Sequence, residues 1–71
     1  MKIGIVGCAG RMGQMLVREI LATDGCALAG GTEALGSDMI GRDVAEIAGA
    51  EAAGLAVGED AAALFQVSDT V

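Results

Sequence analysis

Hydrophobic and polar positions follow two different periods in the first 32 residues of the chain. Ile3, Ile5 and Val6 form a short apolar run that ends at Gly7, which is typical of a buried parallel strand. From residue 11 to residue 24 the apolar positions recur with helical spacing and form one broad stripe, made of Met12, Met15, Leu16, Val17, Ile20 and Leu21. Residues 26–32 are small and apolar, which suits a parallel strand that helices cover closely. The pattern therefore predicts a strand, a helix that Asp24-Gly25 ends, and a second parallel strand.

The rest of the chain predicts shorter elements. Residues 34–41 read as a loop, and Asp43-x-x-Glu46 resembles a capping box that opens a short helix through Ile47 or Ala48, which Gly49 would stop. We expect a short third strand at 55–57, a helix at 59–65, and the opening of a further strand at 69–71. The predicted fold is α/β, a partial doubly wound parallel sheet of the Rossmann type that is truncated near the start of its fourth strand.

Three glycines mark the turn between the first strand and the first helix. Gly7, Gly10 and Gly13 are spaced three apart, a relaxed form of the dinucleotide fingerprint with Ala9 at its second glycine position. We expect Gly7 to allow a sharp turn, Gly10 to let the backbone approach a pyrophosphate, and Gly13 to let helix and strand pack closely. The N–H groups and the dipole at the helix start would attract the anion.

An acidic residue supports this interpretation of the glycines. Glu33 follows Gly13 by twenty residues, at the end of the second predicted strand, where a carboxylate can accept a hydrogen bond from a ribose hydroxyl. The alternative is a purely structural glycine turn that opens an ordinary helix. The agreement of strand, glycine turn and acid favours a dinucleotide site.

Composition and charge exclude several classes of function. The chain has 71 residues and a net charge of −6, with seven acids and only Arg42 as a base after residue 35, which argues against nucleic acid as a partner. Those seven acids are interpreted as a solvated face. No apolar run reaches the roughly 18 residues of a membrane span, and the N-terminus is interpreted as a mature cytoplasmic start.

The few residues capable of other chemistry are interpreted as structural. Two cysteines and no histidine supply neither a metal site nor a disulfide framework. Cys8 precedes a helix start, where a low thiol pKa and a redox role are conceivable, but without a histidine base or a C-x-x-C partner we favour a small core residue. Met12 and Met15 are also interpreted as core residues.

The run from Gly7 to Gln14, with Gly-Arg-Met-Gly at its centre, resembles the N-terminus of the 4-hydroxy-tetrahydrodipicolinate reductase family, also called dihydrodipicolinate reductase. The segment from Leu28 to Glu33, the Gly36-Ser37 pair and the spacing from Gly41 to Gly49 resemble the family in order, as does the lead into residues 69–71. The resemblance covers nearly all of the chain. It implies a cofactor-binding part of a cytoplasmic, homo-oligomeric enzyme of lysine and diaminopimelate biosynthesis, with residues 1–71 as the N-terminal part of its dinucleotide-binding domain.

The resemblance implies hydride transfer from NADH or NADPH to a cyclic, unsaturated dicarboxylate, with catalytic and substrate-binding residues that lie outside this chain. The residues it assigns to the cofactor are Gly7, Cys8, Ala9, Gly10, Arg11, Met12 and Glu33. It favours binding over mere solvation for Arg11. Family members often carry arginine directly after the acid, where this chain has Ala34. That difference favours NADH, because Glu33 would repel a 2′-phosphate with no cation beside it.

Besides a reductase, two other functions stay open at this point: a nucleotide sensor and an inactive structural fragment. The chain is either the cofactor-binding part of a reductase, inactive by itself, or a non-catalytic module that senses nucleotide occupancy and reports it to a partner. A third reading is an inactive structural fragment held together by self-association. Reductase activity of the natural full-length protein would separate the first two.

Overall fold

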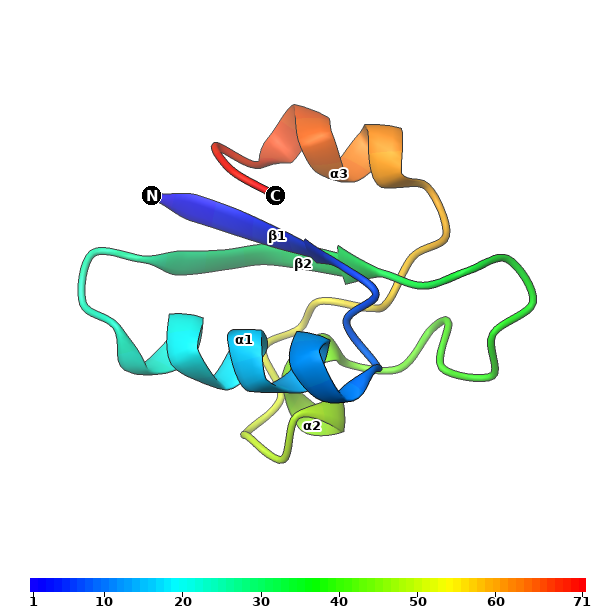
Figure 1. The fold of residues 1–71 in the computed structure, drawn as a ribbon, viewed down its shortest axis with the longest axis horizontal. Coiled ribbons are helices and arrows are strands. Elements are labelled where there is room, and N and C mark those ends of the chain that lie inside the picture. Colours follow the sequence, from blue (N-terminus) through cyan, green and yellow to red (C-terminus); the bar gives the residue numbers. More distant parts are fainter.

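A computed structural model describes residues 1–71 as a small parallel sheet between helical layers (Figure 1). The strands are β1 (Lys2–Val6) and β2 (Ala27–Thr32), and the helices are α1 (Arg11–Ala22), α2 (Val44–Ile47) and α3 (Ala61–Val67). α1 and α2 cover one face of the sheet, and α3 lies on the other (Figure 1). The predicted parallel α/β architecture is therefore confirmed as a partial Rossmann-type fold. No helix has the length and apolar character needed to cross a bilayer.

The β1–α1–β2 unit forms as the pattern predicts. The two strands pair in parallel from Lys2 with Ala27 to Val6 with Thr32, with one irregularity after Ile3. α1 ends at Ala22, two residues before the predicted end, and Gly25 then takes a φ of +83°, which glycine adopts without strain. Both strands thus deliver their carboxyl ends to the same edge of the sheet.

The predicted third strand at 55–57 is wrong as a strand. Val57 and Leu55 exchange backbone hydrogen bonds with Arg42 and Val44 in an antiparallel arrangement, at 2.7 and 2.8 Å. Only Gly58 reaches β2, where its N–H donates to the Gly31 carbonyl at 3.0 Å. Residues 55–57 therefore do not line up along β2, because their hydrogen-bonding groups face the segment before α2.

The segment after α3 lies beside β1, on the side of the sheet opposite Gly58. Thr70 forms a parallel bridge with Ile3, and the Gly4 N–H donates to the Thr70 carbonyl at 2.8 Å. The spatial order is thus Gly58, β2, β1, Thr70, which is the 3-2-1-4 order of a doubly wound sheet. The opening of a strand predicted at 69–71 takes the position expected for a fourth strand.

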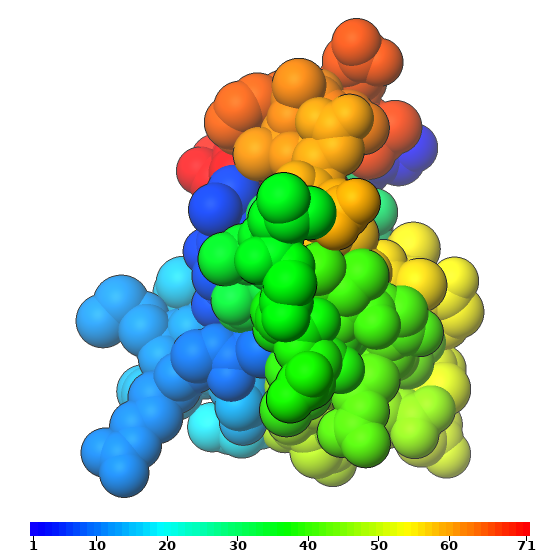
Figure 2. Space-filling view, turned by 90° about the vertical axis from the view of Figure 1, so that its right-hand side faces the viewer, coloured from blue at the N-terminus to red at the C-terminus, as the bar shows by residue number.

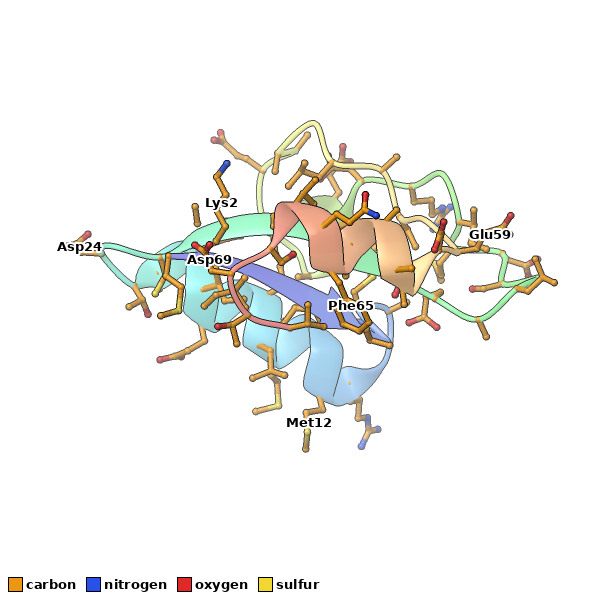
Figure 3. All side chains as sticks on the ribbon, turned by 90° about the horizontal axis from the view of Figure 1, so that it is seen from above. Lys2, Met12, Asp24, Glu59, Phe65 and Asp69 are labelled. Carbon is orange, nitrogen blue, oxygen red and sulfur yellow. The ribbon has the colours of Figure 1, made fainter.

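The core lies between the sheet and the α1–α2 layer, and it corrects the predicted inner face of α1. Gly13, Val17 and Ile20 are the buried residues of this helix. Met12 and Met15, predicted to be core, are 73% and 61% exposed. The contact of Gly13 with the turn fixes the rotation of the helix, so the two methionines lie on its outer flank (Figure 3 for Met12).

The opposite face of the sheet is kept flat by glycine so that α3 can approach. A methyl group on Gly4 would lie 2.7 Å from the Leu64 side chain and 2.7 Å from the Ser68 hydroxyl. Leu64 is the only buried residue of α3, whereas Phe65 is exposed (Figure 3). α3 also begins at Ala61 rather than at residue 59, with Asp60 as its N-cap.

Candidate functional site

The glycine turn closes over the end of β2 through backbone hydrogen bonds. Gly7 has a φ of +79°, and the N–H groups of Gly7 and Cys8 both donate to the Thr32 carbonyl, at 2.8 and 3.1 Å. The Gly10 N–H then donates to the Gly7 carbonyl at 3.2 Å. The sharp turn predicted for Gly7 is confirmed, and the turn is joined to the end of the neighbouring strand.

Gly13 brings α1 against this turn. A Cβ atom at Gly13 would overlap the Gly7 carbonyl oxygen and lie 2.7 Å from the Cys8 Cα. Both are backbone atoms, which cannot move aside as a flexible side chain can. The predicted role of Gly13 in close helix–strand packing is therefore confirmed.

Gly10 has no such internal reason to lack a side chain. Its φ of −73° is open to any residue, and an added Cβ would meet only the Gly7 carbonyl, at an ordinary 3.5 Å. Gly10 lies exposed at the N-cap of α1. The bare backbone here faces solvent rather than another part of the chain.

The N-terminus of α1 differs from those of the two shorter helices. Asp43 and Asp60 cap α2 and α3 by accepting hydrogen bonds from the first backbone N–H groups of each. Gly10 offers no side-chain cap, and the first turn of α1 contains no acid. Within the chain the N–H groups of Arg11, Met12 and Gly13 donate no hydrogen bond, since the helical ladder begins with Gln14 donating to Gly10.

Glu33 lies at the mouth of the glycine turn. It follows β2 directly, and its Oε2 accepts a hydrogen bond from the Ala9 N–H at 2.7 Å. Its own N–H donates to the Gly58 carbonyl at 2.9 Å, which fixes the backbone from which the side chain extends. Figure 2 looks onto this edge of the sheet, where the first turn of α1, in blue, lies beside the green segment that follows β2.

Cys8 belongs to the core beneath the turn. Its side chain is 1% exposed and packs against Gly31, whose missing Cβ would lie 2.7 Å from the sulfur. Burial, and next the negative charge of Glu33, raise the pKa of the Cys8 thiol. A buried, protonated thiol is a poor nucleophile, so the core interpretation of Cys8 is supported. No three His, Cys, Asp or Glu side chains gather in a way that could hold a metal ion.

Arg11 and Met12 occupy the first two positions of α1, with both side chains at the surface. The Met12 side chain points away from the sheet (Figure 3). The structure thus brings together the backbone of the turn, the free N–H groups of the first helical turn and the Glu33 carboxylate. Of the predicted residues, Cys8 contributes packing beneath this group rather than an exposed side chain.

Sequence reasoning missed the contribution of Gln14. Its side-chain Nε2 donates to the Ala9 carbonyl at 2.7 Å, from the fourth position of α1 back into the turn. The signal in the sequence was a glutamine at the fourth position of a helix that follows a glycine loop, because its side chain is long enough to reach back to the loop. The periodicity places Gln14 only on the polar face and therefore does not reveal this contact.

The site is an open edge rather than an enclosed cavity. The hollow between β2 and α3, of about 360 Å³, is lined by Gly30, Leu55 and Leu64 among others and includes no residue of the glycine turn. Any ligand of the turn would therefore lie across the carboxyl ends of the strands. In open parallel sheets this is the edge at which ligands bind.

Comparison with known proteins connects this geometry to a family. Residues 1–71 match the family described as "Dihydrodipicolinate reductase, N-terminus". A protein of Ruegeria pomeroyi named 4-hydroxy-tetrahydrodipicolinate reductase is 46% identical over 69 residues, 97% of this chain and 26% of that protein. Proteins of the same name from Alkalilimnicola ehrlichii and Anaplasma marginale are 43% and 41% identical over 99% and 100% of this chain.

The chain spans about a quarter of the length of these curated relatives. The match extends through both strands and all three helices, including the glycine turn and Glu33. It confirms the resemblance seen in the Gly-Arg-Met-Gly segment. The chain therefore belongs to the dihydrodipicolinate reductase family, of which it represents the N-terminal part.

Proposed function

We propose that residues 1–71 bind the nicotinamide cofactor of a 4-hydroxy-tetrahydrodipicolinate reductase. The single observation that carries the proposal is the 2.7 Å hydrogen bond between the Ala9 N–H and Glu33 Oε2, because it brings the acid to the mouth of the glycine turn. A dinucleotide needs both features at one edge, since its diphosphate and its adenosine ribose are joined covalently.

In the proposed site, backbone N–H groups would bind the diphosphate and a side-chain carboxylate would bind the ribose. The N–H groups of Gly7, Cys8, Ala9 and Gly10 already donate within the chain, so the diphosphate would bind to those of Arg11 and Met12 at the positive end of α1. The exposed Arg11 guanidinium would add a flexible charge. Glu33 Oε2 is engaged by Ala9, which leaves Oε1 to accept a hydrogen bond from the ribose.

The chemistry would be supplied by the bound cofactor and by residues outside this chain. The cofactor provides a hydride from its reduced nicotinamide ring. The relatives' name indicates a 4-hydroxy-tetrahydrodipicolinate substrate, a cyclic dicarboxylate, in lysine and diaminopimelate biosynthesis. Residues 1–71 would hold and orient the cofactor and are not expected to catalyse the reaction alone. The homo-oligomeric state and the cytoplasmic location stay predictions.

NADH is the cofactor we propose for this chain. Ala34, which is exposed and lies two residues beyond the end of β2, follows Glu33, so the next residue in the chain supplies no cation to compensate a 2′-phosphate. Replacing Ala34 with arginine should shift the ratio of kcat/KM values from NADH toward NADPH in the full-length protein. An unaltered ratio would show that this position does not face the 2′ oxygen.

Removal of the acid tests the binding proposal. In the full-length protein, Glu33→Ala should weaken NADH binding by about 1.5 to 3 kcal/mol, the range for a hydrogen bond to a charged group. Fluorescence titration of NADH measures the effect. Glu19→Ala is the matched control, because Glu19 is an exposed acid in the last turns of α1 and far from the turn.

Three outcomes separate the readings. If Glu33→Ala binds NADH with wild-type affinity, Glu33 is not part of the site. A full-length protein that binds NADH without oxidising it in the presence of the cyclic substrate would favour a nucleotide sensor. A protein that binds no nicotinamide cofactor at all would reject the proposal.

A further inference from the structure

Two side chains hold the Ala9 residue from opposite sides. The Glu33 carboxylate accepts from the Ala9 N–H at 2.7 Å, and the Gln14 amide donates to the Ala9 carbonyl at 2.7 Å. We call these two hydrogen bonds the Ala9 clamp. Ala9, Gln14 and Glu33 are all half-buried, so water competes less for these bonds than it would at a fully exposed site.

The Ala9 clamp fixes both peptide groups on either side of one Cα atom. The Glu33 bond fixes the plane before Ala9, and the Gln14 bond fixes the plane after it, which ends at the Gly10 nitrogen. Gln14 also donates its own backbone N–H to the Gly10 carbonyl at 2.9 Å, the first bond of the α1 ladder. One residue therefore connects the turn to the helix through both its main chain and its side chain.

The orientation of the Ala9–Gly10 peptide matters for an anion. A carbonyl oxygen that faces the mouth of the turn would repel a diphosphate, whereas a carbonyl held back toward the helix leaves only N–H groups in front. The N–H of this peptide, that of Gly10, donates to the Gly7 carbonyl at 3.2 Å, the longest hydrogen bond of the turn, so the 2.7 Å bond from Gln14 is the shorter of the two that set its orientation. Without a donor at residue 14, nothing else in the chain binds the Ala9 carbonyl.

We propose that Gln14 is a positioning residue for diphosphate binding, which acts by holding the Ala9 carbonyl away from the bound anion. This inference rests on the proposed cofactor-binding function of the turn. Gln14 does not touch the ligand in this account. It keeps the turn in its binding geometry before the ligand arrives, so its loss affects affinity rather than the hydride-transfer step.

The test compares ligands with and without a diphosphate in the full-length protein. Gln14→Met keeps the length and the helix propensity of the side chain but removes the donor. Calorimetric titration with ADP, NADH and adenosine should give about fivefold weaker binding of ADP and NADH, as expected for one lost neutral hydrogen bond, and unchanged binding of adenosine. The KM for NADH should rise by a similar factor while kcat stays the same.

Two further variants keep the test decisive. Gln14→Ala also removes the donor and has a higher helix propensity, so it replaces Gln14→Met if that variant does not fold. Gln66→Met makes the same substitution at an exposed glutamine of α3 and should change none of the three affinities.

The results distinguish failure of the inference from failure of the proposed function. ADP and NADH affinities unchanged in both Gln14 variants would overturn the inference while leaving the proposed function intact. Equal weakening of ADP, NADH and adenosine would also overturn it, because a general structural role predicts no dependence on the diphosphate. Wild-type protein that binds neither ADP nor NADH would overturn the proposed function and this inference with it.

Discussion

Gly10 and Gly13 lie three residues apart at the start of α1, and their missing side chains serve different ends. At Gly13 an added methyl would collide with the backbone of Gly7 and Cys8. At Gly10 it would meet open space apart from one ordinary contact with the Gly7 carbonyl. Packing within the chain therefore requires glycine at residue 13 but not at residue 10, for which we propose a role toward a ligand.

Substitution of the two glycines should separate stability from binding. Gly13→Ala should lower the free energy of unfolding by about 1 to 3 kcal/mol, because helix and turn must move apart. Gly10→Ala should change it by less than about 0.5 kcal/mol, since the poorer N-cap and the stiffer unfolded chain oppose each other. Urea unfolding of the full-length protein measures both.

Gly10→Ala, which should leave stability almost unchanged, should instead affect ligand binding. A methyl group at Gly10 lies where the diphosphate would approach, so Gly10→Ala should weaken NADH binding while the protein stays folded. A Gly10→Ala protein with wild-type stability and wild-type NADH affinity would show that the ligand does not approach this backbone.

At this scale the sequence predicts backbone roles better than side-chain positions. The roles of Gly7 and Gly13 follow from local geometry that the glycine spacing dictates, and both are confirmed. The prediction that Met12 and Met15 are buried is wrong, because the apolar stripe of α1 is wider than the part of the helix that packs against the sheet. Which part of that stripe turns inward depends on the contact at Gly13, and periodicity alone does not contain it.

At the scale of single elements, the Asp43 side chain connects α2 to the loop that follows it. Its carboxylate caps α2 through Ala45 and Glu46, at 3.0 and 3.1 Å, and also accepts from the N–H groups of Ala53, Gly54 and Leu55 at 2.8 to 3.1 Å. One side chain thus joins the helix start to a loop ten residues further on. Of the seven acids predicted to form a solvated face, Asp43 alone is not exposed, while the exposed Asp60 and Asp69 also accept backbone hydrogen bonds.

The charge of Asp43 should make this connection dependent on pH. Backbone hydrogen bonds, that of Ala53 foremost, hold the pKa of Asp43 below its ordinary value, although partial burial opposes them. A carboxyl whose pKa is lowered on folding stabilises the folded protein above the ordinary aspartate pKa, and this contribution is lost as the pH falls through the lowered value.

Asp43→Asn should therefore unfold at lower urea concentration than wild type near pH 7, and the gap should narrow as the pH drops below about 4. Glu51→Gln is the matched control, an exposed acid in the same segment that should change stability little at either pH. A gap between wild type and Asp43→Asn that is constant over this pH range would mean that the carboxylate charge contributes nothing.

The elements themselves were predicted as far as their signals are local. The cap at Asp43, the end of α2 near Gly49 and the start of α1 depend on residues close in sequence, and each is found. The strand predicted at 55–57 failed because strand formation depends on a partner elsewhere in the chain. Here the segment at 41–44 competes with β2 for the same backbone groups, and neither composition nor periodicity reveals that competition.

As a whole, the molecule directs its two strand ends and the start of its longest helix to one edge. The other surfaces are occupied differently: α3 covers one sheet face, and Thr70 pairs with the amino half of β1. The strand–turn–helix unit that ends at this edge lies within the segment that matches the family. The position of Glu33 beside the turn could be predicted from spacing, whereas its hydrogen bond to Ala9 required the folded chain.

The most direct test of this account is a crystal structure of the full-length protein with NADH bound. We expect the diphosphate oxygens within hydrogen-bonding distance of the Arg11 and Met12 N–H groups, and a ribose hydroxyl on Oε1 of Glu33. The Ala9 carbonyl should still accept from Gln14. A diphosphate bound away from the first turn of α1, or an adenosine ribose on the far side of the sheet from Glu33, would contradict it.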